Sequence, residues 1–84
     1  MGKIILYSSS ECIRCRIVKK MLNVHNVQYE EIIDNKQLMT DKGFSEVPAI
    51  EVDGKTIDEY TNVLHWMQTN GWYSFEEDNK NENN

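Results

Sequence analysis

The sequence is short of several features, and each shortage excludes a class of protein. No apolar run is long enough to cross a membrane and no signal-peptide pattern is present, so we expect a soluble cytoplasmic protein. Only two cysteines occur, which excludes a disulfide-rich secreted scaffold and indicates a functional pair in a reducing compartment. Lys and Arg number 9 against 14 Asp and Glu, and the net charge of −5 disfavours a nucleic-acid partner. The 84 residues fit one domain.

The two cysteines form the motif Cys-Ile-Arg-Cys at residues 12–15, between a strand pattern and a helix pattern. The run Lys-Ile-Ile-Leu-Tyr at residues 3–7 predicts a buried strand, and the apolar spacing after the motif predicts a helix to about Asn23. Cys12 is then at the helix N-terminus and Cys15 on its first turn, so the two sulfurs can close one small disulfide. The positive helix end and nearby basic side chains favour the Cys12 thiolate, so we expect Cys12 to be the nucleophile.

The helix that follows the motif is expected to be amphipathic. Its predicted core stripe contains Ile13, Ile17, Val18, Met21 and Leu22. Four of the nine basic residues of the chain lie on its remaining faces, at Arg14, Arg16, Lys19 and Lys20. The end of the molecule that carries the cysteines is therefore locally positive. This charge fits an anionic small molecule or an acidic protein surface, and it equally fits a solvated helix face.

Three more strands and two more helices are predicted in the rest of the chain. We expect strands at residues 27–33, 47–52 and 55–57, the last two joined by an Asp53-Gly54 hairpin turn. A short helix capped by Asp34 or Asn35 runs to Lys42. A last helix, capped by Asp58 or Thr61 and ended by Gly71, buries one apolar face made of Tyr60, Val63, Leu64 and Met67.

The element order is β-α-β-α-β-β-α, which predicts an α/β fold with a four-stranded mixed sheet and three helices. Residues 1–75 form the predicted domain, and Trp72, Tyr73 and Phe75 are expected to fold back on it. Residues 76–84 contain no apolar side chain, so we expect a disordered acidic and Asn-rich tail.

A zinc site and a pair of inert buried thiols are the alternatives to redox chemistry at the two cysteines. Zinc normally takes four ligands, and only His25 and His65 remain as soft partners, neither at zinc-finger spacing. A Cys-x-x-Cys pair between a strand and a helix is typical of a redox couple. We therefore predict a dithiol couple and no metal.

Three motifs in this order make the chain similar to the glutaredoxin branch of the thioredoxin fold. They are residues 7–15 (Tyr-Ser-Ser-Ser-Glu-Cys-Ile-Arg-Cys), 43–50 (Gly-Phe-Ser-Glu-Val-Pro-Ala-Ile) and 53–57 (Asp-Gly-Lys-Thr-Ile). The resemblance implies a thiol–disulfide oxidoreductase in which Cys12 attacks a disulfide and Cys15 resolves the mixed disulfide. It also implies a cis bond before Pro48, with the backbone of Val47 pairing with the bound thiol's peptide and Pro48 shaping the groove. We expect the protein to be a monomer.

Several residues around the cysteines differ from the usual glutaredoxin pattern. Ile13 and Arg14 replace Pro-Tyr, and Ser9 stands where a Lys usually pairs with a glutathione carboxylate. Residues 58–62 (Asp-Glu-Tyr-Thr-Asn) replace Gly-Gly and the Asp that holds the γ-glutamyl end of glutathione. The two added carboxylates repel this anionic tripeptide, whereas the hydroxyl and the amide that follow are able to donate hydrogen bonds. The expected substrate-binding residues are Arg14, Val47, Pro48, Thr61 and Asn62.

A related subgroup resembles glutaredoxin but takes electrons from thioredoxin reductase and passes them to ribonucleotide reductase. Its members often lack Pro-Tyr between the cysteines and carry a Gly-Phe-x-x-Leu-Pro stretch, which residues 43–48 closely match. Their Trp-Ser-Gly-Phe falls on residues 57–60, where only the aromatic Tyr60 is kept.

Two readings of the function follow, neither with a bound cofactor. The first reduces protein or glutathione-mixed disulfides through Cys12 and Cys15, with glutathione as the reductant. The second uses thioredoxin reductase and donates electrons to ribonucleotide reductase. An iron–sulfur cluster or metal-binding module is an alternative of another class, and a binding domain on this scaffold is a third.

Overall fold

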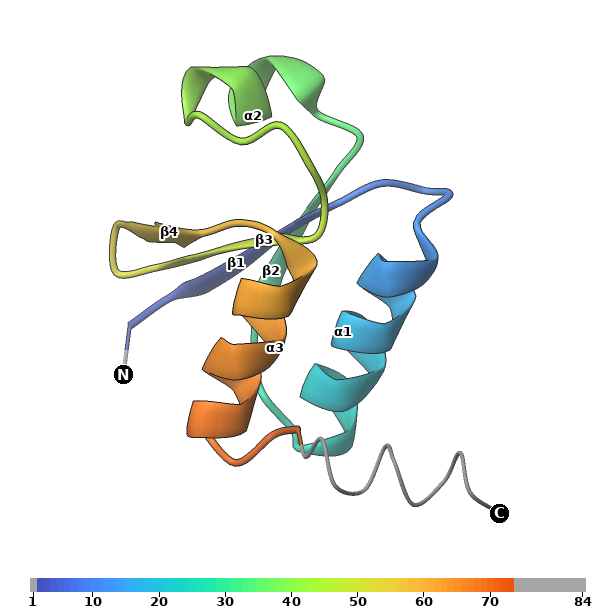
Figure 1. The fold of residues 1–84 in the computed structure, drawn as a ribbon, viewed down its shortest axis with the longest axis vertical. Helices are drawn as coiled ribbons and strands as arrows, with labels where there is room; N and C mark the ends of the chain where they lie inside the picture. Colours follow the sequence, from blue (N-terminus) through green and yellow to red (C-terminus); the bar gives the residue numbers. More distant parts are fainter. Residues whose placement is uncertain (1, 74–84) are drawn as a thin grey trace.

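The structure is a computed structural model that describes residues 2–73. Its elements run in the order β1 (Ile4–Ser8), α1 (Ile13–Val24), β2 (Glu30–Ile33), α2 (Lys36–Asp41), β3 (Ala49–Val52), β4 (Lys55–Ile57) and α3 (Tyr60–Thr69) (Figure 1). This order confirms the predicted α/β fold. The tail predicted at residues 76–84 and the packing predicted for Phe75 lie outside the described residues. Within residues 2–73, no helix has the length and apolar character needed to span a membrane.

The four strands form one mixed sheet in the order β2-β1-β3-β4. Strands β1 and β2 are parallel, with Leu6 opposite Glu31, while β3 is antiparallel to both β1 and β4. The β3–β4 turn has left-handed backbone angles at both central residues, with φ of 52° at Asp53 and 80° at Gly54. Two-residue hairpins of this kind favour Asp-Gly, so the predicted hairpin is confirmed.

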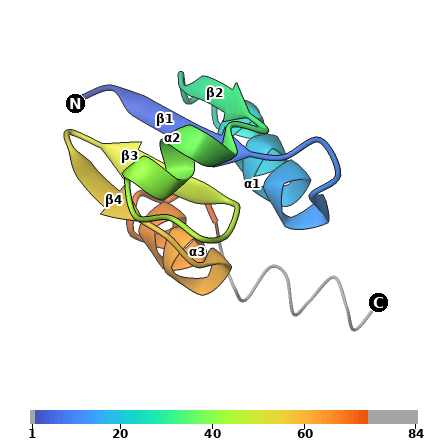
Figure 2. The same cartoon turned by 90° about the horizontal axis from the view of Figure 1, so that it is seen from above.

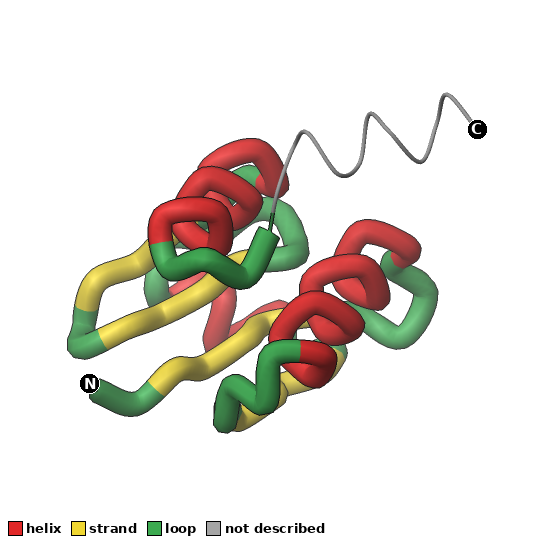
Figure 3. The backbone as a smooth tube through the Cα atoms, turned by 90° about the horizontal axis from the view of Figure 1, so that it is seen from below, coloured by secondary structure: helices red, strands yellow, loops and turns green. Residues whose placement is uncertain are grey.

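Helices cover both faces of the sheet. Helices α1 and α3 lie side by side on one face, and α2 lies on the other (Figures 2 and 3). The larger core cluster lies between the sheet and the helix pair and contains Ile4, Leu6, Val18, Leu22, Ile50, Val63, Leu64 and Met67. The smaller cluster lies under α2 and contains Tyr7, Met39, Phe44 and Ala49. The loop between β1 and α1 follows the C-terminal end of β1, one of the two inner strands of the sheet.

Two strand boundaries differ from the sequence prediction. Strand β2 begins at Glu30 and not at residue 27, because Val27 and Tyr29 pack against the core from an irregular segment. Strand β3 begins at Ala49, after Val47 and Pro48. Pro48 has no backbone N–H to donate to a strand ladder, which explains why pairing starts only at Ala49, two residues after the predicted start.

The predicted core stripe of α1 was wrong at two positions. The helix buries Cys15, Val18 and Leu22, whereas Ile13 is 73% exposed and Ile17 is 36% exposed. These isoleucines face a different side of the helix from Cys15 and Val18, and a helix packed on a sheet buries only one side. The apolar pattern of this helix therefore covers two faces.

The helix ends agree only in part with the predicted caps. The side chain of Asn35 accepts a 3.1 Å hydrogen bond from the backbone N–H of Leu38, which confirms one of the two predicted caps of α2. Helix α3 starts from Glu59, which makes no side-chain capping bond, so the predicted caps at Asp58 and Thr61 were wrong. Beyond α3, Trp72 and Tyr73 pack on the core as predicted, with the Trp72 and Trp66 rings 5.3 Å apart.

Candidate active site

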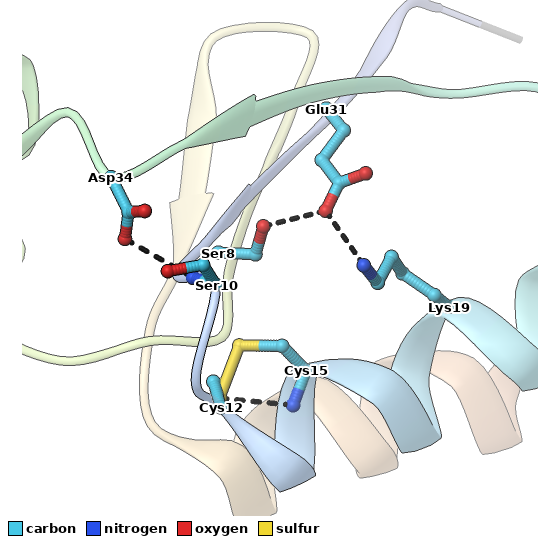
Figure 4. The surroundings of a disulfide bond; sticks show 7 residues. All are labelled: Ser8, Ser10, Cys12, Cys15, Lys19, Glu31 and Asp34. Carbon is cyan, nitrogen blue, oxygen red and sulfur yellow. Dashed lines mark hydrogen bonds and ion pairs between the residues drawn. A yellow bond between two sulfur atoms is a disulfide. The ribbon is translucent and has the colours of Figure 1, made fainter.

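The two cysteines are joined by a disulfide at the start of α1 (Figure 4). Cys12 is the N-cap residue and Cys15 lies on the first turn, with their Cα atoms 5.2 Å apart. Cys15 is 1% exposed, while Cys12 is partly exposed. The backbone N–H of Cys15 donates a 3.0 Å hydrogen bond to Sγ of Cys12. Cys12 is therefore the outer sulfur, and it lies where a free backbone donor stabilises negative charge.

Arg14 connects the start of α1 with the start of α3. Its guanidinium carbon lies 5.2 Å from the centroid of the Tyr60 ring. A cation over an aromatic face contributes about 0.5–1 kcal/mol at an exposed site. The first turn of α1 has no acidic side chain, and Arg14 and the positive end of the helix dipole both favour an anion at Cys12.

A polar network lies at the inner side of α1, close to the disulfide (Figure 4). The hydroxyl of Ser8, which is 1% exposed, donates a 2.6 Å hydrogen bond to Oε2 of Glu31. Nζ of Lys19 lies 3.0 Å from the same carboxylate oxygen. Burial by itself raises the pKa of Glu31, but the hydrogen bonds from Ser8 and Lys19 outweigh burial and lower that pKa below its ordinary value. Glu31 is therefore a carboxylate at neutral pH.

The loop before β3 contains the cis peptide bond Val47–Pro48. Pro48 is buried and Val47 is half-buried. The residues that line a groove of about 630 Å³ include Ser9, from the segment that leads to Cys12, and Phe44 and Val47. The groove therefore lies among the segment before Cys12, helix α2 and the loop that precedes Pro48.

The start of α3 is the remaining part of the predicted site. The side-chain amide of Asn62 donates a 3.2 Å hydrogen bond to the carbonyl of Asp58 and lies 3.5 Å from Oε2 of Glu59. Glu59 has a left-handed φ of 67°, a conformation that favours glycine. Thr61 is exposed. Here the Asn62 amide is bonded to the preceding turn, and carboxylates flank the helix start.

Four residues of this region were not among the predicted site residues: Ser8, Lys19, Glu31 and Tyr60. Lys19 was expected on a solvent-facing side of α1 but forms an ion pair across to β2. The sequence contained one signal that Lys19 lies near the site, because Lys19 follows Cys15 by one helical turn and so shares its face of the helix. Nothing in the local sequence pairs Ser8 with Glu31, since that contact depends on the β1–β2 register.

Metal ligands do not gather in the described part of the chain. Across residues 2–73, no group of three or more His, Cys, Asp or Glu side chains is arranged to hold a metal ion. A second hollow, of about 710 Å³, lies at the opposite end of β1 and is lined by Lys3, His25 and Trp72 among others.

Comparisons with known proteins agree with this geometry. A family model described as Glutaredoxin matches residues 4–57. The glutaredoxin-like protein NrdH of Lactococcus lactis subsp. lactis (strain IL1403) is 34% identical over 55 residues, which cover 60% of this chain and 76% of that protein.

Solved structures with the same fold extend the comparison. The crystal structure of the thioredoxin-like protein BC3987 is 26% identical, with a TM-score of 0.64 over 84% of this chain and 100% of that one. The buckwheat glutaredoxin–glutathione complex is 21% identical, with a TM-score of 0.64 over 84% of this chain and 72% of that one, a likeness in fold alone.

Proposed function

Because this chain belongs to the glutaredoxin family of thiol–disulfide oxidoreductases, we propose that its Cys12/Cys15 pair reduces protein disulfides and is itself reduced by thioredoxin reductase. We further propose ribonucleotide reductase as the electron acceptor. The similarity to the NrdH protein and the match of residues 43–48 to the corresponding subgroup support this choice.

The proposed reaction is two thiol–disulfide exchanges in series. The Cys12 thiolate attacks one sulfur of the substrate disulfide, forms a mixed disulfide and releases the other substrate sulfur as a thiolate. Cys15 then loses its proton and attacks Sγ of Cys12, which closes the Cys12–Cys15 disulfide and releases the second substrate thiolate. The substrate gains two electrons and, after protonation, carries two thiols. The reductase returns two electrons to the cysteine pair.

The relative exposure of the two sulfurs supports these roles. Cys12 is partly exposed and accepts the backbone N–H of Cys15, so it is reachable and its thiolate is stabilised. Cys15 is 1% exposed, which protects it from outside disulfides while it faces Sγ of Cys12. Attack from outside at Cys12 followed by internal attack from Cys15 fits this arrangement.

The choice of reductant depends on the charges and hydrogen-bond donors at the start of α3. Asp58 and Glu59 place two carboxylates there, and the side-chain amide of Asn62 is bonded to the carbonyl of Asp58. Bound glutathione would bring its own carboxylates to this end of the molecule, and like charges at short range repel. The two carboxylates and the occupied amide at this helix start therefore disfavour an anionic tripeptide.

The test compares two electron sources for the oxidised protein, each driven by NADPH. One reaction contains thioredoxin reductase, and the other contains glutathione with glutathione reductase. We expect rapid turnover with thioredoxin reductase and slow turnover with glutathione. Fast turnover with glutathione alone would overturn the proposed reductant and leave a glutathione-dependent oxidoreductase. A Cys12→Ser variant should be inactive in both reactions, and activity in that variant would overturn the role of the cysteine pair.

A further inference from the structure

The outward side of α1 carries apolar side chains that the fold does not bury. Four large hydrophobic residues are exposed within residues 2–73, and three of them lie on this helix: Ile13 at 73%, Ile17 at 36% and Val24 at 63%. Their spacing of four and then seven residues places them in one row along the helix. Figure 3 shows no other described element over the outward side of α1.

Positive charge surrounds this apolar row. Lys20 falls in the row between Ile17 and Val24, and Arg16 lies beside it; both side chains are exposed. The helix itself contains no acidic residue, although the whole chain has a net charge of −5. Lys19 has a partner in Glu31, whereas no ion pair within residues 2–73 engages Arg16 or Lys20. An apolar row among unneutralised cations is complementary to an apolar surface that has acidic neighbours.

The length of the row indicates the size of its partner. From Ile13, next to Cys12, to Val24 the helix rises about 16 Å at 1.5 Å per residue. A fully extended tripeptide spans at most about 11 Å, so glutathione held at Cys12 does not reach Val24. The surface of a protein substrate is large enough to contact the helix from Cys12 to Val24.

We propose that the outward side of α1, which we call the α1 face and define by Ile13, Arg16, Ile17, Lys20 and Val24, is the docking surface for the protein whose disulfide Cys12 reduces. This proposal rests on the proposed function. The partner presents Asp and Glu side chains around an apolar centre beside its disulfide. A second copy of this chain is a poor occupant, because two identical basic faces repel each other.

The probes are two synthetic disulfide peptides that share one Cys-x-x-Cys loop and differ only in flanking charge. The acidic peptide has Asp, Glu and Leu around the loop, and the basic peptide has Lys in place of Asp and Glu. In low salt we expect kcat/KM for the acidic peptide to be about tenfold higher, equivalent to about 1.4 kcal/mol. The ratio should fall towards one at high salt, because screening weakens exposed charge contacts.

Matched substitutions separate the α1 face from other exposed residues. Arg16→Gln with Lys20→Gln should remove the preference for the acidic peptide, and Ile17→Ser should slow both peptides. The controls are Lys55→Gln, an exposed cation on β4, and Ile33→Ser, an exposed isoleucine at the end of β2. They should leave both rates unchanged. The proposal would be overturned if the wild type reduced both peptides equally well, or if the control variants lost as much activity as the α1-face variants.

A binding measurement keeps docking separate from catalysis. The reduced acidic peptide is titrated into the Cys12→Ser variant, and backbone amide NMR shifts are followed. Shifts concentrated at Ile13, Ile17 and Lys20 support docking on the α1 face even if the proposed function fails. Shifts confined to other elements would overturn docking there. Turnover of 2-hydroxyethyl disulfide, a small neutral substrate, reports the cysteine chemistry alone. Any change that the α1-face variants show with this substrate is divided out before the two peptides are compared.

Discussion

The backbone N–H of Cys15 donates a hydrogen bond to Sγ of Cys12 across 3.0 Å, inside the first turn of α1. The two residues therefore contribute more than a pair of sulfurs, because the peptide group of one supports charge on the other. This donor belongs to the main chain, so it is kept in every side-chain variant. Substitutions of nearby side chains measure how much they add to the stabilisation of charge on Sγ of Cys12.

Arg14 is the first such side chain. Replacing Arg14 with Gln removes the cation near Cys12, and we expect reduced Cys12 to be alkylated by iodoacetamide about two- to fivefold more slowly at pH 7. That range corresponds to about 0.5–1 kcal/mol for one exposed charge. Arg14→Lys keeps the charge and should retain most of the rate. Equal loss in both variants would show that packing on Tyr60, and not charge, matters.

The order of the two exchanges predicts a trapped intermediate. Cys15→Ser should leave substrate bound to Cys12 as a mixed disulfide, since no internal thiol remains to release it. Intact-mass spectrometry under non-reducing conditions should show one adduct per chain. Cys12→Ser should form little adduct, because Cys15 is 1% exposed. A stable adduct in Cys12→Ser would reverse the assigned roles.

The Ser8–Glu31 bond predicts a stability effect. Ser8→Ala removes a buried donor to a carboxylate, and we expect the free energy of unfolding to fall by about 1–3 kcal/mol. Urea unfolding of the oxidised protein at pH 7 measures this loss. Ser45→Ala, at an exposed serine in a loop, is the matched control and should change little. Equal, small effects at both positions would contradict a structural role for the network.

The same network predicts the sign of a pH dependence. In the folded protein the hydrogen bonds from Ser8 and Lys19 lower the pKa of Glu31 despite its burial. In the unfolded chain a Glu side chain has a pKa of about 4.3. The unfolded state therefore takes up the proton first as the pH falls. Stabilisation by Glu31 is present above about pH 4.3 and is lost as the pH falls through the folded pKa.

Glu31→Gln should consequently destabilise the protein at pH 7 and have a smaller effect near pH 3. Unfolding curves at both pH values test this. Glu30→Gln is the control, because its ion pair with Lys3 is exposed and contributes about 0–1 kcal/mol. A Glu31→Gln effect that grows on acidification would contradict the assigned shift.

Glu59 offers a test of reductant choice. Glu59→Gly removes a carboxylate and suits the left-handed φ of 67°, so we expect faster turnover with glutathione and a stability within about 1 kcal/mol of wild type. Glu59→Gln removes only the charge. If both variants turn over faster with glutathione, the charge of Glu59 is what limits this reaction. If only Glu59→Gly turns over faster, the backbone conformation at this position limits it. No gain in either would contradict the role given to this helix start.

Several features were readable from sequence because they depend on neighbouring residues. A strand pattern followed by Cys-x-x-Cys and a helix pattern placed Cys12 at the N-terminus and Cys15 on the first turn. Asp53-Gly54 predicted the hairpin, because few residue pairs adopt left-handed angles twice in succession. The element order and the fold class followed from such local signals together with the glutaredoxin-like motifs.

Other features were decided only when distant segments packed together. The apolar pattern of α1 fits two faces, and contact with the sheet buried Val18 while leaving Ile13 and Ile17 exposed. The strand register placed Glu31 on the α1 side of the sheet, within reach of Ser8 and Lys19. Local pattern sets which residues share a side of a helix or strand, but the fold chooses which side meets the core, since burying one face leaves the other for solvent or a partner.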